Sequence, residues 1–291
     1  MVQNYHWLAG RISGDLHRNS SITKNNSTMK VNTVVNWTIG LVCTVLVSAC
    51  NDDEDEPVAP IPTPTINFTQ VSGSGDITAK LTEFRTLLGD PLNTTLNQTA
   101  GRREINWDGV PANLTNVDTY PGDFFNSTDP AVGAGRKRGA VFTTPGTGFR
   151  ISDNDFTDIV ADYGNQFNAF SPARTFVAVG SNQTDVTFRL PGTNTPATVK
   201  GFGAIFSDVD NANSTTLEFF EGDKSLGTFK APVRNDVNGF SFVGVKFPDN
   251  RVSKVVIKSG NVPLSSRFAD GSQYDLVIMD DFLYDEPTAS N

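Results

Sequence analysis

Two short acidic stretches hold the side chains best suited to bind a metal ion. Asp208 and Asp210 follow an apolar run and stand in a segment rich in Asp and Asn, while Asp280 and Asp281 lie inside a later apolar run. Carboxylates that converge at a strand end can coordinate a hard cation through oxygen atoms. The sequence therefore predicts a structural calcium ion at these residues, and an Asx-rich turn without metal is the alternative for Asp208 and Asp210.

Asp280 and Asp281 raise a separate question about orientation. Adjacent residues of a regular strand point to opposite faces of the sheet. One of these two carboxylates would then face the core or a groove, where an unpaired charge is costly. We expect a metal ion, backbone donors or an arginine to satisfy it, and Arg102, Arg103 and Arg174 are the candidate arginines.

Aromatic side chains suggest a second kind of chemistry, the binding of sugars. Trp107 is followed by Tyr120 and Phe124 in a loop-like region, and exposed aromatic rings can stack on a sugar. A single tryptophan in the core is the alternative. Glu104 and Asp108 lie close together in the sequence and form a candidate acid pair for glycoside hydrolysis, but sequence proximity does not fix the separation of their carboxyl groups.

The segment before Cys50 has the features of a secretion signal. Lys30 precedes the apolar residues 31–49, which end in small side chains. This order is typical of a signal peptide. A membrane-spanning helix is the alternative, but the segment is short for a span, and Asn32 and Asn36 would be unpaired in hydrocarbon.

Residues 47–50, Val-Ser-Ala-Cys, resemble the lipobox of bacterial lipoproteins. This resemblance implies a diacylglyceryl group on the Cys50 thiol, cleavage just before Cys50, and a protein held by lipid in the bacterial cell envelope, at the outer membrane or cell surface. Counting from Met29 gives a signal peptide of normal length, residues 29–49. We therefore expect residues 1–28 to lie upstream of the true start.

The predicted cleavage removes side chains that many enzymes need. His6, His17 and Cys43 all precede Cys50. A mature chain without histidine or a free thiol cannot use a Ser-His-Asp or Cys-His mechanism, nor bind zinc through those side chains. The formal net charge of −9 argues against nucleic acid as a partner, because phosphate binding needs a basic surface.

Residues 50–65 are predicted to form a tether. An acidic run at 51–56 must remain solvated, and the four prolines of 57–65 favour an extended polyproline conformation. Acidic residues directly after the lipidated cysteine also resemble the surface-export signal of Bacteroidota lipoproteins. A generic soluble tether is the alternative.

The elements that must position these residues belong to one predicted domain, 66–287, followed by a short tail at 288–291. Segment 76–88 has apolar residues at helical spacing, with Asp76 placed to cap the start and Gly89 just after the end. Beyond residue 139 the apolar period is two, and turn-type sequences separate the apolar runs. The predicted strands are 139–143, 175–179, 185–190, 199–207, 216–221, 227–230, 240–247, 252–258 and 275–284.

This pattern predicts an all-β fold, a two-sheet antiparallel sandwich of jelly-roll type with one short N-terminal helix. The runs 201–206 and 240–245 are apolar at both odd and even positions. Such strands are covered on both faces, or they face a concave groove.

Five segments also resemble a family of secreted bacterial proteins, and the resemblance covers most of the domain but implies no activity. The segments are 101–111, 138–149, 170–188, 191–210 and 277–287. More loosely, a last strand that ends in Asp-Asp-aromatic resembles carbohydrate-binding jelly rolls and galactose-binding-like domains. That second resemblance implies a structural calcium ion near the final strand.

The sequence thus predicts a membrane-anchored, non-catalytic module at the cell surface that binds a glycan. A carboxylate-dependent glycoside hydrolase or lyase is one alternative. A structural or adhesion protein that binds another protein is the other, and an exposed apolar patch would favour it.

Overall fold

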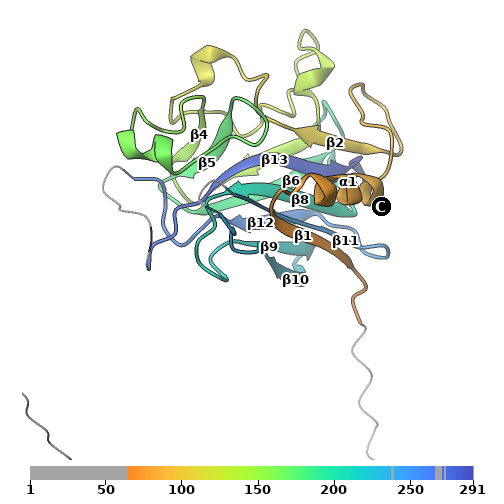
Figure 1. Cartoon of the computed structure of the whole chain (residues 1–291). Helices are drawn as coiled ribbons and strands as arrows, with labels where there is room; N and C mark the ends of the chain where they lie inside the picture. Colours follow the sequence, from red (N-terminus) through yellow and green to blue (C-terminus); the bar gives the residue numbers. More distant parts are fainter. Residues whose placement is uncertain (1–64, 237–238, 266–270, 272, 291) are drawn as a thin grey trace, which may run out of the picture. The chain divides into compact units, whose positions relative to one another are not determined.

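The computed structural model describes residues 65–236, 239–265, 271 and 273–290 (Figure 1). Within these residues two seven-stranded sheets, with antiparallel pairing throughout, face each other (Figure 1). The predicted all-β, two-sheet sandwich is confirmed. All described residues belong to one compact unit.

The first sheet contains the strand that carries Asp280 and Asp281. Its order is β1-β11-β8-β13-β5-β4, and β2 pairs with the end of β13. Its strands are β1 (Thr69–Gly75), β2 (Arg102–Ile105), β4 (Gly148–Ser152), β5 (Thr175–Val179), β8 (Gly201–Ser207), β11 (Phe240–Lys246) and β13 (Ile278–Asp285).

The second sheet has the order β10-β9-β12-β6-β7-β14, and β3 pairs with β6. Its strands are β3 (Ala140–Thr143), β6 (Gln183–Arg189), β7 (Pro196–Thr198), β9 (Thr216–Glu221), β10 (Lys224–Lys230), β12 (Lys254–Lys258) and β14 (Thr288–Ala289). In β6 the buried side chains alternate with half-buried ones, as expected for a sheet with one face on the core and the other toward water. Strand β14 lies in the segment that the sequence assigned to a tail.

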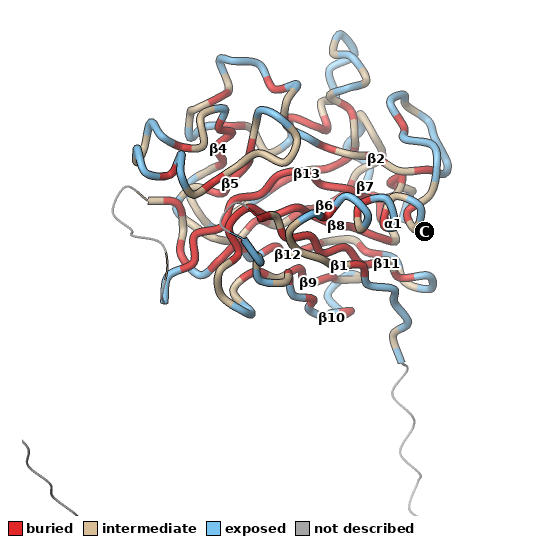
Figure 2. The backbone as a smooth tube through the Cα atoms, viewed as in Figure 1, coloured by how far each residue is buried: buried red, intermediate tan, exposed pale blue. Residues whose placement is uncertain are grey.

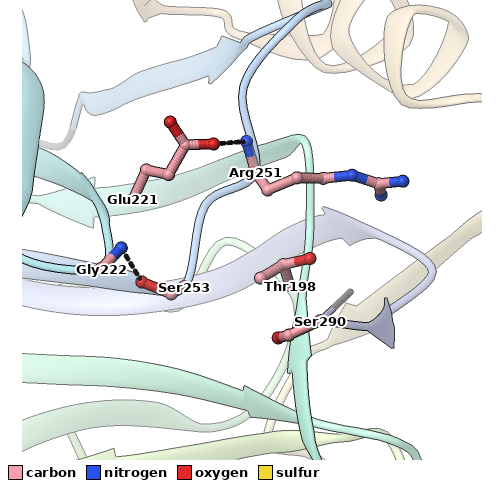
Figure 3. A pocket seen from close by; sticks show the side chains of 6 residues that line it. All are labelled: Thr198, Glu221, Gly222, Arg251, Ser253 and Ser290. Atoms are coloured by element: carbon pink, nitrogen blue, oxygen red, sulfur yellow. Dashed lines mark hydrogen bonds between the residues drawn. The ribbon is translucent and has the colours of Figure 1, made fainter.

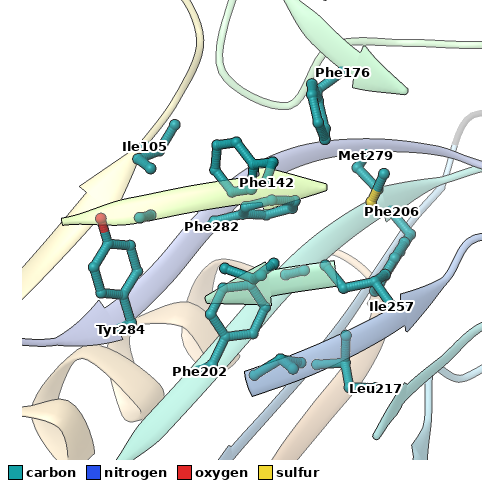
Figure 4. Packing of buried hydrophobic residues seen from close by; sticks show 14 of the residues in the cluster. Ile105, Phe142, Phe176, Phe202, Phe206, Leu217, Ile257, Met279, Phe282 and Tyr284 are labelled. Atoms are coloured by element: carbon teal, nitrogen blue, oxygen red, sulfur yellow. The ribbon is translucent and has the colours of Figure 1, made fainter. Parts of the chain in front are cut away.

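Aromatic rings fill the space between the sheets (Figure 4). Phe282 of β13 lies 5.8 Å from Phe142, 5.9 Å from Phe176 and 5.3 Å from Phe202, measured between ring centroids. Each large ring removes much apolar surface from water, and edge-to-face pairs add a further contribution. The buried residues between the sheets therefore form one continuous core (Figure 2).

The first sheet is covered on both of its faces. Helix α1 (Thr78–Leu88) packs Leu81, Phe84 and Leu88 against the face turned away from the core, and the segment 153–167 covers the neighbouring part of that face. All seven residues of β8 are consequently buried. Of the two sequence-based alternatives for such strands, cover on both faces is the correct one.

The residues that flank α1 have the roles that the sequence predicts. The backbone N–H of Thr78 donates to Asp76 Oδ1 at 3.0 Å, which satisfies one of the free donors of the first turn. Gly89, just after the helix, has a φ of 110°, in the region that glycine tolerates best.

Two glycines in the first sheet allow α1 to approach closely. A Cβ atom on Gly203 would lie 2.8 Å from the ring of Phe84, and one on Gly244 would lie 2.7 Å from it. We expect Gly244→Ala to lower the free energy of unfolding by about 1–3 kcal/mol, because the ring and the helix would have to shift. Urea denaturation of the variant measures this change.

Gly133→Ala is the matched control, because a Cβ there meets no atom within 4 Å. Equal midpoints for Gly244→Ala and Gly133→Ala would contradict the close packing of the helix on the sheet.

Candidate functional site

Two neighbouring cavities lie beside β14, and Arg251 lines both of them. The first has a volume of about 390 Å³ and the second about 290 Å³. We call them together the β14 groove. The first is lined by Thr198, Glu221, Gly222, Arg251, Ser253 and Ser290 (Figure 3), and the second by Leu88, Thr99, Ala100, Gly101, Lys200, Arg251, Asp285, Glu286 and Thr288.

Four separate chain segments form the first cavity. β14 pairs with β7, which places Thr288 opposite Thr198. Glu221 ends β9 and leads into the turn before β10, and Arg251 precedes β12. The groove therefore exists only when the end of the chain lies in the second sheet.

Glu221 fixes the segment that carries Arg251. Its carboxylate accepts a hydrogen bond from the Arg251 backbone N–H at 2.8 Å and another from Asn250 Nδ2 at 3.0 Å. Both hydrogen bonds lower the pKa of Glu221, and the one from the Arg251 backbone has a larger effect than the one from Asn250. Glu221 is therefore a stable anion near neutral pH and has no proton to give to a substrate.

The hydroxyl group of Thr198 lies beneath the lining of the first cavity. Thr198 is 5% exposed, and its Oγ1 atom is sealed from solvent and makes no hydrogen bond with any described residue. The Arg251 side chain extends over the side of the cavity formed by Thr198 and Ser290 (Figure 3), and its Nη1 donates to Thr288 Oγ1 at 3.0 Å. The cavity thus combines a guanidinium group with hydroxyl groups that can both donate and accept.

The aromatic residues predicted to bind a sugar lie in the core instead. Trp107, Tyr120 and Phe124 are 0%, 3% and 2% exposed. Trp107 stacks on Phe176 with 4.1 Å between ring centroids and 5° between ring planes. The prediction of a stacking platform is wrong for these three residues, because they are covered by the two sheets and have no open ring face. For Trp107 the core alternative holds.

Asp208 and Asp210 both bind Arg234. The guanidinium forms an ion pair with Asp208, and its Nε donates to Asp210 Oδ1 at 2.6 Å. Gln166 Nε2 donates to Asp208 Oδ2 at 2.7 Å. An arginine thus supplies the positive charge in this turn. This arrangement agrees with the alternative prediction of an Asx-rich turn without a metal ion.

Asp280 and Asp281 lie on the same face of β13, so the prediction of opposite faces is wrong. Met279 pairs with Phe206 and Phe282 with Ala204, which leaves both aspartates opposite Ile205 of β8. This arrangement is a β-bulge, which turns one extra side chain to the same side. Both carboxylates are buried and point away from the core between the sheets.

The two carboxylates share the hydroxyl group of Ser171. Its Oγ lies 3.2 Å from Asp280 Oδ1 and 2.8 Å from Asp281 Oδ1, and the Phe170 backbone N–H donates to Asp280 Oδ2 at 2.5 Å. Burial, and then the adjacent charge of Asp281, raise the pKa of Asp280 to about 9. Asp280 is therefore protonated at neutral pH and can donate a hydrogen bond to Asp281.

None of the three candidate arginines satisfies this pair. Arg102 binds Glu104, Arg103 binds Glu286, and Arg174 donates to backbone carbonyls. The two carboxylates are instead satisfied by a backbone donor and by a proton that they share. The sequence predicts an arginine, a metal ion or the backbone as the partner. In the part of the chain that the structure describes, no three or more acidic, histidine or cysteine side chains are arranged to hold a metal ion.

The candidate acid pair Glu104 and Asp108 is held by separate partners. Arg85 Nη2 donates to Glu104 Oε2 at 2.8 Å, and Arg102 Nε donates to Oε1 at 2.8 Å. Burial alone would raise the pKa of Glu104, but the bonds from Arg85 and Arg102 outweigh it and lower that pKa. Asp108 accepts from the Arg174 backbone N–H at 3.2 Å, and burial raises its pKa. Glu104 is thus tied to two arginine side chains, and Asp108 to the backbone of a third arginine.

No residue of the β14 groove was predicted from the sequence to bind a ligand there. Glu221 ends the predicted strand 216–221, Arg251 stands in a turn-type segment, and Thr198 and Ser290 carry no distinctive pattern. The turn composition was a correct local signal, but nothing in it indicated which turns meet.

No family model, curated protein or solved structure matches this chain. The predicted signal peptide, Cys50 and the tether up to residue 64 lie outside the described residues. None of the helices described is long and apolar enough to cross a membrane.

Proposed function

We propose that this protein is a non-catalytic carbohydrate-binding module, held at the bacterial cell envelope by lipid on Cys50, and that the β14 groove is its binding site. The observation that carries the proposal is a cavity of about 390 Å³ in which the exposed Arg251 lies beside the exposed hydroxyl group of Ser290. A sugar hydroxyl can both donate and accept, so it could bond to Ser290 next to the guanidinium.

The groups that line the groove support binding rather than catalysis. Glycoside hydrolysis needs one protonated carboxyl group and one carboxylate on opposite sides of the scissile bond. Glu221 is a fixed anion. Burial raises the pKa of Asp285, but both of its carboxylate oxygens accept hydrogen bonds from the backbone N–H groups of Lys200 and Gly201, which hold it as an acceptor.

A hydrolase remains the second candidate because of Asp280. A carboxyl group that stays protonated at neutral pH is the form that a general acid needs. Asp280 is 0% exposed, however, and it lines neither cavity of the β14 groove. Hydrolysis of chromogenic glycosides that is lost in Asp280→Asn would favour this candidate over the binding module.

Binding of the full chain, kept in detergent, to a glycan array and to insoluble polysaccharides tests the main proposal. We expect retention on at least one polysaccharide, and Arg251→Ala should weaken it because the side chain lines both cavities. Lys258→Ala, an exposed residue at the far end of β12, is the control and should bind like the original chain. A chain that binds no saccharide would overturn the proposal.

Lipid anchoring has its own test in a bacterial host. The protein should partition into detergent as a chain that starts at Cys50, and Cys50→Ala should keep its signal peptide, because the thiol is the acylation site that precedes cleavage. Mass spectrometry of the purified chains reads both outcomes. Normal processing of the variant would remove the lipoprotein proposal.

Calcium remains a prediction for the same protein. If a calcium ion binds at Asp280 and Asp281, adding calcium to chelator-treated protein should raise the melting temperature, because a bound ion stabilises the folded state by mass action. Asp281→Asn should abolish the rise. Identical melting curves with calcium and with chelator would contradict the calcium site. The shared proton would then be what neutralises this pair.

A further inference from the structure

We infer that the β14 groove is selective for an anionic saccharide, one that carries a carboxylate or sulfate group, and that Arg251 binds this group. The inference rests on the proposed function and names the class of sugar. Its basis is the set of charged side chains that line the groove, together with the hydrogen-bond and ion-pair partners that each of them has.

Arg251 is the positively charged group placed to meet a ligand. It lines both cavities and is exposed, and its guanidinium forms no ion pair with any described residue. Its one side-chain hydrogen bond is the donation from Nη1 to Thr288 Oγ1 at 3.0 Å. Five other arginines each bind a carboxylate: Arg85, Arg102, Arg103, Arg150 and Arg234.

The carboxylates of the groove form no ion pair with Arg251, because other donors already hold their oxygen atoms. Glu221 accepts from the Arg251 backbone and Asn250, and Glu286 accepts from the buried Arg103. Asp285 Oδ1 accepts from the backbone N–H groups of Lys200 at 2.8 Å and Gly201 at 2.6 Å. An anionic group in the groove would therefore meet a guanidinium that has no ion-pair partner among the described residues.

The ammonium group of Lys200 adds to this local positive charge. Its Nζ donates to the backbone carbonyl of Pro248 at 2.8 Å, which leaves its charge without a carboxylate partner among the described residues. The formal net charge of −9 opposes an anionic ligand at long range. Recognition must therefore come from short contacts within the groove, where a planar guanidinium can bind a carboxylate or sulfate through two parallel hydrogen bonds.

The exposed hydroxyl group of Ser290 supplies a second, neutral contact in the first cavity. A sugar held there could donate to Ser290 Oγ while its charged group binds Arg251. The two residues are thus expected to contribute differently, Arg251 to the preference for charge and Ser290 to the affinity for any saccharide.

Titration calorimetry with paired ligands tests the inference on the full chain in detergent. One pair is an oligogalacturonate and its methyl ester, which differ in the carboxylate. The other is a sulfated galactan oligosaccharide and its desulfated form, which differ in the sulfate. We expect the charged member of at least one pair to bind about tenfold tighter or more, and the pair that shows the preference identifies the charged group.

Three variants separate the contributions. Arg251→Ala should remove the preference for the charged member, and Arg251→Lys should restore only part of it, because lysine keeps the charge without the planar fork. Ser290→Ala should weaken both members of a pair by a similar factor, and its melting temperature should not fall, because the residue is exposed. Lys258→Ala should leave the preference unchanged.

Equal binding of the charged and neutral members would overturn the inference and leave the proposed function standing. A charge preference that survives in Arg251→Ala, in a variant with the melting temperature of the original chain, would also overturn it. Failure of all four ligands to bind, together with an empty glycan array, would overturn the inference and the proposed function alike.

Discussion

Arg103→Ala is expected to lower the free energy of unfolding by about 3–5 kcal/mol, a large part of the stability of a single domain. Arg103 is 0% exposed, and its Nε and Nη2 atoms donate to Glu286 at 2.6 and 2.8 Å. Alanine would leave the Glu286 carboxylate buried and without its counter-ion. Removing one partner of a buried pair costs far more than the pair itself contributes, because the remaining charge has lost its water.

Other contacts make Arg103 difficult to replace. Its Nη2 also donates to the Thr95 carbonyl at 2.8 Å, and Asn93 Nδ2 donates to Glu286 Oε2 at 2.8 Å. The pair therefore joins β2, the loop at 93–95 and the end of β13. Loss of the guanidinium removes a donor from the Glu286 carboxylate and from the Thr95 carbonyl.

Urea denaturation measures the effect against two controls. Lys80→Ala removes an exposed ion pair with Glu83 and should cost less than about 1 kcal/mol. The double variant Arg103→Met with Glu286→Leu should be more stable than Arg103→Ala, because no buried charge remains. A cost for Arg103→Ala as small as that for Lys80→Ala would contradict the assignment of a buried pair.

The stability of the domain should fall as the pH rises toward about 9, and Asp280→Asn should remove much of this fall. Burial, then the neighbouring Asp281, raise the pKa of Asp280 from its ordinary value of 3.8 to about 9 in the folded chain. Between these two values the folded state holds a proton that the unfolded state has released. The stabilisation from this proton is complete below a pH of about 4, declines as the pH rises, and is lost once the pH exceeds about 9.

Melting curves between about pH 5 and pH 9 check this dependence. The neutral amide of Asp280→Asn needs no proton, so the variant should be more stable than the original chain at the upper end, by at least about 1 kcal/mol. Asp223→Asn, at an exposed residue in the turn before β10, should keep the original slope. Parallel curves for Asp280→Asn and the original chain would show that the pair holds no extra proton.

Much of the fold could be predicted because apolar periodicity is a local property. The strands around residues 201–207 and 240–246 were recognisable from their continuous apolar runs, and α1 from its spacing and its flanking residues Asp76 and Gly89. β2 could not be found in this way. It reads Arg-Arg-Glu-Ile, and its polar side chains lie in the sheet only because Glu286 and Arg85 meet them there.

The same limit applies to β1 and β14. β1 is rich in small and polar residues, and it lies at the edge of the first sheet beside β11. β14 has two residues and is defined by its pairing with β7. Neither carries an apolar pattern of its own, so only the partner strand identifies them.

The sequence by itself determined the all-β sandwich, the helix before it and the presence of adjacent acids at Asp280 and Asp281. The tertiary structure decided where those acids point, because the bulge arises from the pairing of β13 with β8, which is remote in the chain. It also decided that Trp107 is buried and that Arg251 forms no ion pair with any residue in the described part of the chain. Burial and charge pairing depend on which distant segments close around a side chain, and residue type and spacing alone do not specify those segments.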